Sequence, residues 1–166
     1  MNISIIAGDE TKPYFVALDA AGELGWESGR FANKGRPEAH VIEILTEAAS
    51  LSYRAYLRKR KVSYIFAGKT ELDCCLAMEK LHRLFGIRKL LVCGGGAADW
   101  SFLCAGMVDE LSLVLSPVTD GSCGEANLFT QIPEVSEGTP VEFTLKAVER
   151  TGEGGLHLTY LAKNAK

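Results

Sequence analysis

The chain has 166 residues, with 47% hydrophobic and 23% charged side chains, which is ordinary for a single globular domain. A formal net charge of −3 argues against a general nucleic-acid binder, and no stretch has the length of a membrane span or the form of a signal peptide. We therefore expect a cytoplasmic protein without nucleic-acid or membrane partners.

The cysteines and histidines indicate neither a disulfide framework nor a metal centre. The cysteine number is odd, no C-x-x-C pair occurs, and the mostly apolar surroundings favour buried, reduced thiols. The histidines are widely spread and show no metal-ligand spacing, so we expect no metal. The cysteines are Cys74, Cys75, Cys93, Cys104 and Cys123.

The N-terminal half of the chain predicts strands that are separated by loops and one helix. Residues 2–7 are either a short strand or the end of a longer element. Residues 26–37 are rich in glycine and basic side chains and predict a loop. The predicted strands are 13–19, 39–46 and 62–67, and the predicted helix is 52–61, with Tyr53, Tyr56 and Leu57 on one face.

Strand and helix patterns alternate over residues 40–106. Thr70 with Asp73 three residues later predicts an N-cap for a helix over 71–85. Residues 90–93 form a short apolar run, which predicts a buried parallel strand. A short helix over 97–106 follows, with Gly106 at its end. This alternation predicts βαβ units with parallel pairing.

After Gly106 the pattern changes to longer alternating stretches. Residues 107–117 predict a strand, residues 120–125 an irregular loop, and residues 141–149 and 156–162 a hairpin. The predicted fold class is α/β, with a mostly parallel sheet flanked by helices and an antiparallel C-terminal hairpin.

Three glycines separate the strand predicted at 90–93 from the following helix. A strand, a glycine turn and a helix together direct free backbone N–H groups at an anion, and glycines permit close approach and positive φ. The segment contains no G-x-G-x-x-G and no P-loop lysine. A tight turn without a ligand remains the alternative.

Residues 90–118 resemble a known family. Leu-Leu-Val-Cys-Gly-Gly-Gly, then Ala-Gly-Met-Val-Asp-Glu-Leu-Ser-Leu, then Ser-Pro-Val is similar to the reductase domain of the riboflavin-biosynthesis deaminase–reductases. That domain has the dihydrofolate-reductase fold. The resemblance extends less sharply from Tyr14 to Lys163.

The resemblance implies an NADPH-dependent reductase that acts on a small heterocyclic or sugar-derived molecule and forms a homodimer through the C-terminal hairpin. It implies that the pyrophosphate of NADPH meets Gly94, Gly95, Gly96 and Ala97. It also implies that Thr46 and Gly68, at two other strand ends, lie near the adenosine half. The same location follows from the rule that ligands bind beyond the carboxyl ends of strands.

Two departures from the family pattern affect the expected substrate. Cys93 stands where riboflavin reductases usually carry a glutamate, and no Ser-x-Asp-Gly motif precedes Pro13. We therefore expect a single reductase-type domain that is N-terminally incomplete and has little activity on the riboflavin-pathway pyrimidine. A non-catalytic nucleotide-binding or dimerising remnant of the fold is the alternative function.

The remaining candidates have structural interpretations. Asp109-Glu110 could serve acid–base chemistry, but an anchor for the turn after Gly106 explains the pair. The basic run over 54–61 suits a helix C-terminus, and it or Lys69 could also contact a 2′-phosphate. No histidine has a serine or cysteine partner that the spacing suggests, so nucleophilic catalysis has no support.

Overall fold

The computed structural model describes residues 13–165 except 33, 120, 122, 123, 125, 126, 134–137 and 153. The chain divides into two compact units, Met1–Arg88 (unit 1) and Lys89–Lys166 (unit 2). The strand expected at residues 2–7 and most of the loop expected at 120–125 lie outside the described residues.

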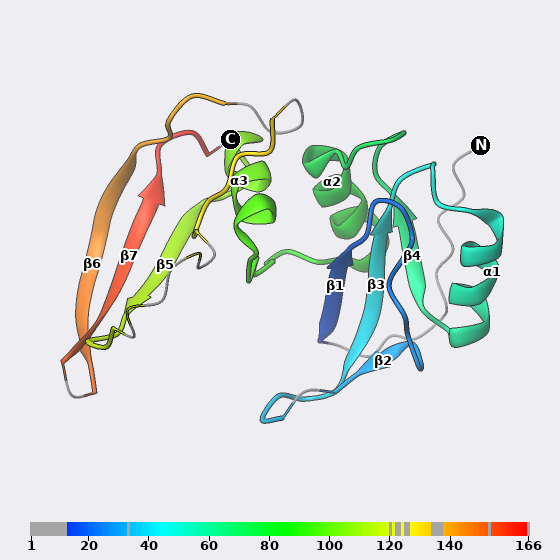
Figure 1. The fold of residues 1–166 in the computed structure, drawn as a ribbon, viewed down its shortest axis with the longest axis horizontal. Coiled ribbons are helices and arrows are strands. Elements are labelled where there is room, and N and C mark those ends of the chain that lie inside the picture. Colours follow the sequence, from blue (N-terminus) through cyan, green and yellow to red (C-terminus); the bar gives the residue numbers. More distant parts are fainter. Residues whose placement is uncertain are drawn as a thin grey trace. The chain divides into compact units, whose positions relative to one another are not determined.

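Unit 1 contains a sheet in which three strands run parallel (Figure 1). The central strand, β3 (Ala39–Leu45), pairs in parallel with β1 (Tyr14–Leu18) and with β4 (Ser63–Phe66). All three strands were expected from the sequence, within one or two residues at each end.

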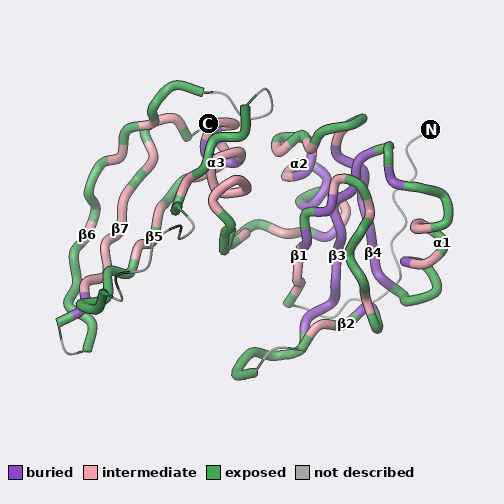
Figure 2. The backbone as a smooth tube through the Cα atoms, viewed as in Figure 1, coloured by how far each residue is buried: buried purple, intermediate pink, exposed green. Residues whose placement is uncertain are grey.

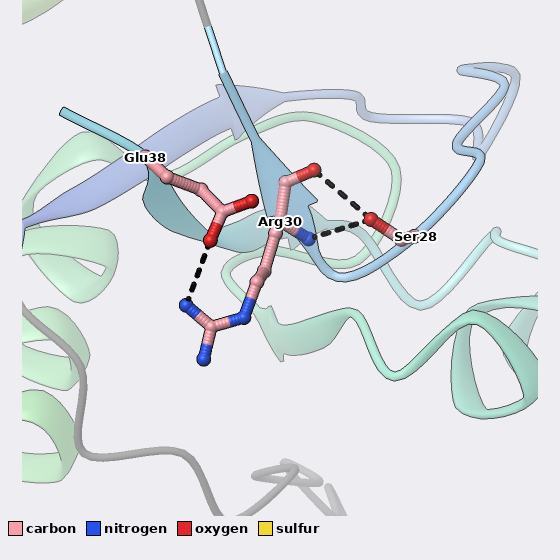
Figure 3. Close-up of polar contacts among 3 residues, drawn as sticks. All are labelled: Ser28, Arg30 and Glu38. Atoms are coloured by element: carbon pink, nitrogen blue, oxygen red, sulfur yellow. Dashed lines mark hydrogen bonds and ion pairs between the residues drawn. The ribbon is translucent and has the colours of Figure 1, made fainter. Parts of the chain in front are cut away.

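A short strand, β2 (Arg30–Phe31), lies within the segment that was expected to be only loop, and it pairs antiparallel with β3. Figure 3 shows how Arg30 is held there: its Nη1 lies 3.2 Å from Glu38 Oε2, and its backbone N–H donates to Ser28 Oγ at 3.2 Å. The basic charge of Arg30 is therefore engaged locally.

Both helices in the described part of unit 1 begin at side-chain caps and end at left-handed residues. Helix α1 (Leu51–Arg60) begins after Ser50, whose Oγ accepts from the Tyr53 N–H at 3.1 Å. Helix α2 (Cys74–Phe85) begins after Asp73 rather than Thr70, so the expected cap was wrong. Asp73 Oδ1 accepts from the Leu76 N–H at 2.9 Å, which satisfies one of the free donors of the first turn.

One core cluster of unit 1 lies between the sheet and α1. Every residue of β3 and β4 is buried, which Figure 2 shows as continuous purple along both strands. Such burial is expected for apolar strands in a parallel sheet covered by helices. The main cluster consists of Val41, Leu45, Ala49, Leu57, Val62, Tyr64 and Phe66.

Unit 2 contains helix α3 (Gly96–Cys104) and an antiparallel sheet in the order β5-β7-β6. Its strands are β5 (Glu110–Leu115), β6 (Phe143–Thr151) and β7 (Gly155–Ala162). The β6–β7 hairpin confirms the expected C-terminal hairpin, with a register shift between Leu145 and Ala147. The α/β fold class is confirmed, whereas parallel pairing among the described residues is confined to β1, β3 and β4.

The expected buried strand at Leu90–Cys93 is wrong in this structure. These residues are in no helix or strand, and Leu91 and Val92 are 74% and 38% exposed. An apolar run of four residues becomes a strand only by pairing with a neighbour, and none of the described strands pairs with it. The second βαβ unit expected from the sequence is therefore absent from the described part of the chain.

Four of the five cysteines lie in the described residues. Cys74, Cys75, Cys93 and Cys104 are free thiols, as expected, but none of them is fully buried. Among the described residues, no group of three or more His, Cys, Asp or Glu side chains could hold a metal ion. No helix in the described ranges is long and apolar enough to cross a membrane.

Candidate functional site

Thr46 and Gly68 lie together at the carboxyl edge of the unit 1 sheet. Thr46 follows β3, and Gly68 follows β4. The Glu47 N–H donates to the Gly68 carbonyl at 3.1 Å, and the Ala48 N–H donates to the Lys69 carbonyl at 3.2 Å. These bonds join the two loops in which sequence analysis expected the adenosine half of a dinucleotide.

Thr46 is fully buried and is tied to the loop after β1. Its Oγ1 donates to the Ala20 carbonyl at 2.6 Å, and its backbone N–H donates to the same oxygen at 3.1 Å. The hydroxyl proton is therefore already used within the protein. Thr46 shapes this edge by joining its own loop to the loop after β1.

Gly68 has a backbone conformation that requires glycine. Its φ is +118°, and a Cβ at this position would lie 1.8 Å from the Glu71 carbonyl oxygen. A close approach of two backbone segments at positive φ is strained for any other residue. The glycine is thus explained by the turn itself, whether or not a ligand lies beside it.

The structure distinguishes Arg54 from the rest of the basic run. Its Nη2 donates to the Glu47 carbonyl at 2.9 Å, and its guanidinium carbon lies 4.7 Å from the centre of the Phe66 ring. Its Nε is buried and has no hydrogen-bond partner among the described residues. Arg58 and Arg60 bond elsewhere, to the Tyr64 hydroxyl and the Glu27 carbonyl. Arg54 therefore places a positive charge beside the Thr46–Gly68 edge.

A buried acidic cluster, which the sequence analysis missed, lies beneath the same loops. Glu43, in the middle of β3, is 0% exposed, and Asp19, directly after β1, is 9% exposed. Glu43 Oε2 accepts from Trp26 Nε1 at 2.6 Å, and Glu43 Oε1 lies 2.7 Å from the Tyr53 hydroxyl. The signal in the sequence was a lone carboxylate in an otherwise apolar strand, which needs a buried partner.

In unit 2 the three glycines of the turn have different environments. Gly94 has φ +94°, and Gly95 has φ −73° as the N-cap of α3. A Cβ at Gly95 would have no described atom within 4 Å. The peptide bond between Gly94 and Gly95 is cis. Of the three glycines, only Gly94 has the positive φ that was expected of the turn, and Gly95 faces open space.

Gly96 and Ala97 are engaged within unit 2. The Gly96 carbonyl accepts from the Thr130 N–H at 2.9 Å, and a Cβ at Gly96 would lie 2.3 Å from the Asn127 carbonyl oxygen. The Ala97 carbonyl accepts from Ser101 Oγ at 2.8 Å. Gly96 is therefore required by packing against the segment at 127–130.

Asp99 lies in the first turn of α3 and was not among the candidate site residues expected from the sequence. Its carboxylate accepts a hydrogen bond from the Gly94 N–H, and burial raises its pKa. A carboxylate in the first turn also offsets the positive end of the helix dipole. One donor of the turn is thus occupied by the chain's own acidic group.

The other candidate groups have structural roles. Glu110 Oε2 accepts from Lys146 Nζ at 2.6 Å, which lowers the pKa of this carboxyl, so Glu110 is engaged in an ion pair on the sheet of unit 2. His157 Nε2 lies 2.8 Å from Ser112 Oγ on the exposed sheet of unit 2, a pairing that the spacing did not suggest. His40 similarly contacts Ser63 at 2.8 Å, but both residues are buried beyond the reach of a substrate.

Comparisons with solved structures show the same fold. A pyrimidine reductase-like protein from Corynebacterium diphtheriae has a TM-score of 0.71 at 19% identity, over 90% of this chain and 61% of that chain. RibD from Acinetobacter baumannii has a TM-score of 0.61 at 21% identity, over 89% of this chain and 37% of that one. The fold is thus the dihydrofolate-reductase-like fold of these reductases.

Comparisons of sequence identify the family. A 2,5-diamino-6-ribosylamino-4(3H)-pyrimidinone 5′-phosphate reductase from Methanothermobacter thermautotrophicus is 34% identical over 84 residues, which is 51% of this chain and 38% of that protein. The chain therefore spans well under two thirds of the length of this curated relative. The family model described as the RibD C-terminal domain matches residues 29–157. The chain belongs to the RibD C-terminal domain family.

Proposed function

We propose that this protein is an NADPH-dependent reductase of the riboflavin-pathway class, acting in the cytoplasm on a small heterocyclic or sugar-derived molecule. The observation that carries the proposal is the open space at Gly95, at the N-terminus of α3, in a chain of the RibD C-terminal domain family. The matched pyrimidinone phosphate reductase supports the substrate class.

The turn at Gly94–Ala97 is proposed to bind the pyrophosphate. Backbone N–H groups at a helix N-terminus favour anions, and a side chain at Gly95 would fill the space that phosphates need. Because Gly96 packs against Asn127 and Thr130, the binding contact falls on Gly95 and on the first N–H groups of α3.

The Thr46–Gly68 edge of unit 1 is proposed to bind the adenosine half. The buried Nε of Arg54 is a donor without a partner in the described part of the chain, and the guanidinium is anchored by Glu47 and Phe66. Arginine suits a phosphate because its planar group offers several parallel donors. Arg54 is thus the candidate for the 2′-phosphate that distinguishes NADPH from NADH.

When bound, the cofactor supplies the hydride, and the protein supplies binding, orientation and exclusion of water. The residue before the turn, Cys93, is exposed, and its identity bears on which substrate is reduced. By resemblance a glutamate is usual at this position, so a thiol there removes a carboxylate that is expected to contact the pyrimidine. Turnover of the pathway pyrimidine is therefore expected to be low.

Steady-state oxidation of NADPH with 2,5-diamino-6-ribosylamino-4(3H)-pyrimidinone 5′-phosphate tests this function. The parent chain is expected to remain near background, and Cys93→Glu is expected to raise turnover at least tenfold, because it restores the missing carboxylate. Cys93 is exposed, so the larger side chain is accommodated without repacking. Cys75→Glu, at another exposed thiol, is the matched control and should leave turnover unchanged.

Each outcome separates the candidate functions. High turnover by the parent chain would contradict the role given to Cys93 while supporting the reductase. Binding of NADPH without turnover by either protein would favour the alternative, a non-catalytic nucleotide-binding remnant of the fold. Failure of both proteins to bind NADPH would exclude the proposed function.

The protein is also proposed to form a homodimer through the sheet of unit 2. Leu145 and Val148 on the edge strand β6 are each 52% exposed. They stand opposite Tyr160 and Leu158 of β7, and residues opposite one another share a face of the sheet. A half-exposed apolar face on an edge strand is a surface that proteins normally cover.

Light scattering coupled to size-exclusion chromatography should give a dimer mass at tens of micromolar protein. Leu145→Glu should shift the mass to a monomer without unfolding the chain, because the side chain is already half exposed. Thr144 pairs with Leu161, and its side chain lies on the other face of the sheet from Leu145. Thr144→Glu is therefore the matched control and should remain dimeric. A monomeric parent protein would contradict this association.

A further inference from the structure

The buried carboxyls of Asp19 and Glu43 form a cluster in unit 1 that is not among the proposed cofactor contacts. Asp19 Oδ1 accepts from the Gly22 N–H at 2.9 Å, and Oδ2 accepts from the N–H groups of Glu23 and Leu24 at 2.7 and 2.8 Å. Three backbone donors stabilise an anion, so the pKa of Asp19 lies below its usual range although burial alone would raise it. Asp19 is therefore the ionised member of the pair.

The contacts of the Tyr53 hydroxyl favour a proton on Glu43. The hydroxyl oxygen lies 2.7 Å from the Leu24 carbonyl, 2.7 Å from Glu43 Oε1 and 3.2 Å from Asp19 Oδ2. A tyrosine has one proton to donate, and a carbonyl only accepts. If that proton goes to Leu24, the short contact between Tyr53 and Glu43 requires a proton on the glutamate.

The groups that face Glu43 favour this protonated form. Burial, the largest cause, and the hydrogen bond with Asp19 raise the pKa of Glu43, while Tyr53 and Trp26 lower it, and together these groups bring it to about 7. From the other side of the cluster, Tyr56 bonds the backbone of Trp26 through its hydroxyl. The basic side chains Arg54 and Arg60 of α1 donate elsewhere, to the carbonyls of Glu47 and Glu27.

The cluster is connected to the candidate adenosine edge through one residue. The turn that Asp19 holds includes Ala20, and the Ala20 carbonyl accepts both bonds from Thr46. Loss of the proton on Glu43 would place two carboxylates in contact within this buried site, which is unfavourable. The repulsion would displace the 19–24 turn and with it Thr46.

We propose that the Asp19–Glu43 pair is a pH-sensitive structural switch that orders the Thr46–Gly68 edge when Glu43 is protonated and loosens it when Glu43 ionises. The switch itself depends only on unit 1. Its effect on dinucleotide affinity rests on the proposed function.

Thermal unfolding against pH tests the switch. The folded protein holds the Glu43 proton up to about pH 7, whereas the unfolded chain releases it near 4.5, so stability is greatest below 4.5 and falls as pH rises between these values. The melting midpoint of the parent chain should fall by about 5–10 °C between pH 5 and pH 8. Glu43→Gln, whose amide carries hydrogens toward Tyr53 and Asp19 at every pH, should remove this fall and exceed the parent midpoint at pH 8.

Glu23→Gln is the matched control because Glu23 is an exposed carboxylate in the same turn, and it should keep the parent slope. Infrared difference spectra of the parent chain should show a protonated carboxyl band at pH 6 that disappears above pH 8. The switch would be overturned if the melting midpoint fell equally with pH in the parent and in Glu43→Gln, or if this band were absent. If Glu43→Gln fails to fold, the infrared spectrum of the parent alone is the test.

NADPH titrations at pH 6 and pH 8.5 test the connection to the cofactor edge. The dissociation constant at pH 8.5 divided by that at pH 6 should be at least threefold larger for the parent than for Glu43→Gln. Titration of the 2′-phosphate affects both proteins equally and therefore cancels in this comparison. Equal ratios would overturn the connection while leaving the switch. A protein that shows the stability switch but binds no NADPH would exclude the proposed function instead.

Discussion

NADPH is expected to raise the melting midpoint of this protein by about 5–10 °C at a hundredfold excess over its dissociation constant. A ligand that binds only the folded state adds about 2.7 kcal/mol to the free energy of unfolding at that excess, and each kcal/mol moves the midpoint by roughly 2–4 °C. Gly95→Val should reduce the NADPH-induced shift to about 1 °C or less, because the side chain fills the space proposed for the pyrophosphate.

The structure makes Gly95→Val a clean probe. Valine accepts φ −73°, no described atom lies within 4 Å of the added Cβ, and loss of glycine at an N-cap costs about 1 kcal/mol or less. Gly25→Val, at another open glycine, should retain the full shift. A flat melting curve at millimolar NADPH would exclude the cofactor, and an unchanged shift in Gly95→Val would move the pyrophosphate elsewhere.

The same assay addresses the adenosine edge. NADH lacks the 2′-phosphate, so it should stabilise the parent chain less than NADPH does. Arg54→Gln should reduce the NADPH shift to that of NADH, while leaving the NADH shift unchanged. A similar loss for both cofactors would mean that Arg54 supports the fold of this edge rather than binding the phosphate.

Gly68→Ala is expected to destabilise the protein by about 3–5 kcal/mol. The added Cβ would lie 1.8 Å from the Glu71 carbonyl oxygen, and φ +118° is strained for alanine. The melting midpoint should therefore fall by roughly 10 °C or more, measured by circular dichroism without ligand.

Gly35→Ala separates the cost of positive φ from the cost of the contact with Glu71. Gly35 also has a positive φ, at +82°, but a Cβ there meets no described atom within 4 Å. Its midpoint should fall by only a few degrees, which measures backbone strain alone. A Gly68→Ala midpoint equal to that of Gly35→Ala would contradict the contact with Glu71 and would free Gly68 for a purely ligand-binding role.

Local features of the chain were predictable because their causes lie within a few residues. The apolar run of β3, the C-cap at Gly86 and the alternation of the β6–β7 hairpin each follow from neighbouring side chains. The cap of α2 was predicted three residues early, because Thr70 and Asp73 offer similar capping groups. The bond of the Asp73 N–H to the Ala67 carbonyl, outside the helix, decided between them.

The location of the candidate site was predictable from the family pattern, but the environment of each residue in it was not. The glycines of the turn look alike in sequence, yet Gly96 packs against Asn127 and Gly95 faces open space. Arg54 was one cation among several in its run, and its contacts with Glu47 and Phe66 distinguish it.

The sequence by itself determined the α/β class, most strand and helix positions and membership of the RibD C-terminal domain family, since these depend on local periodicity and motif spacing. Only the tertiary structure decided that Leu90–Cys93 is not a strand and that the pKa of Glu43 is raised. Strand pairing needs a neighbour from elsewhere in the chain, and the pKa of Glu43 depends on burial and on Asp19, Trp26 and Tyr53, which folding alone brings into contact.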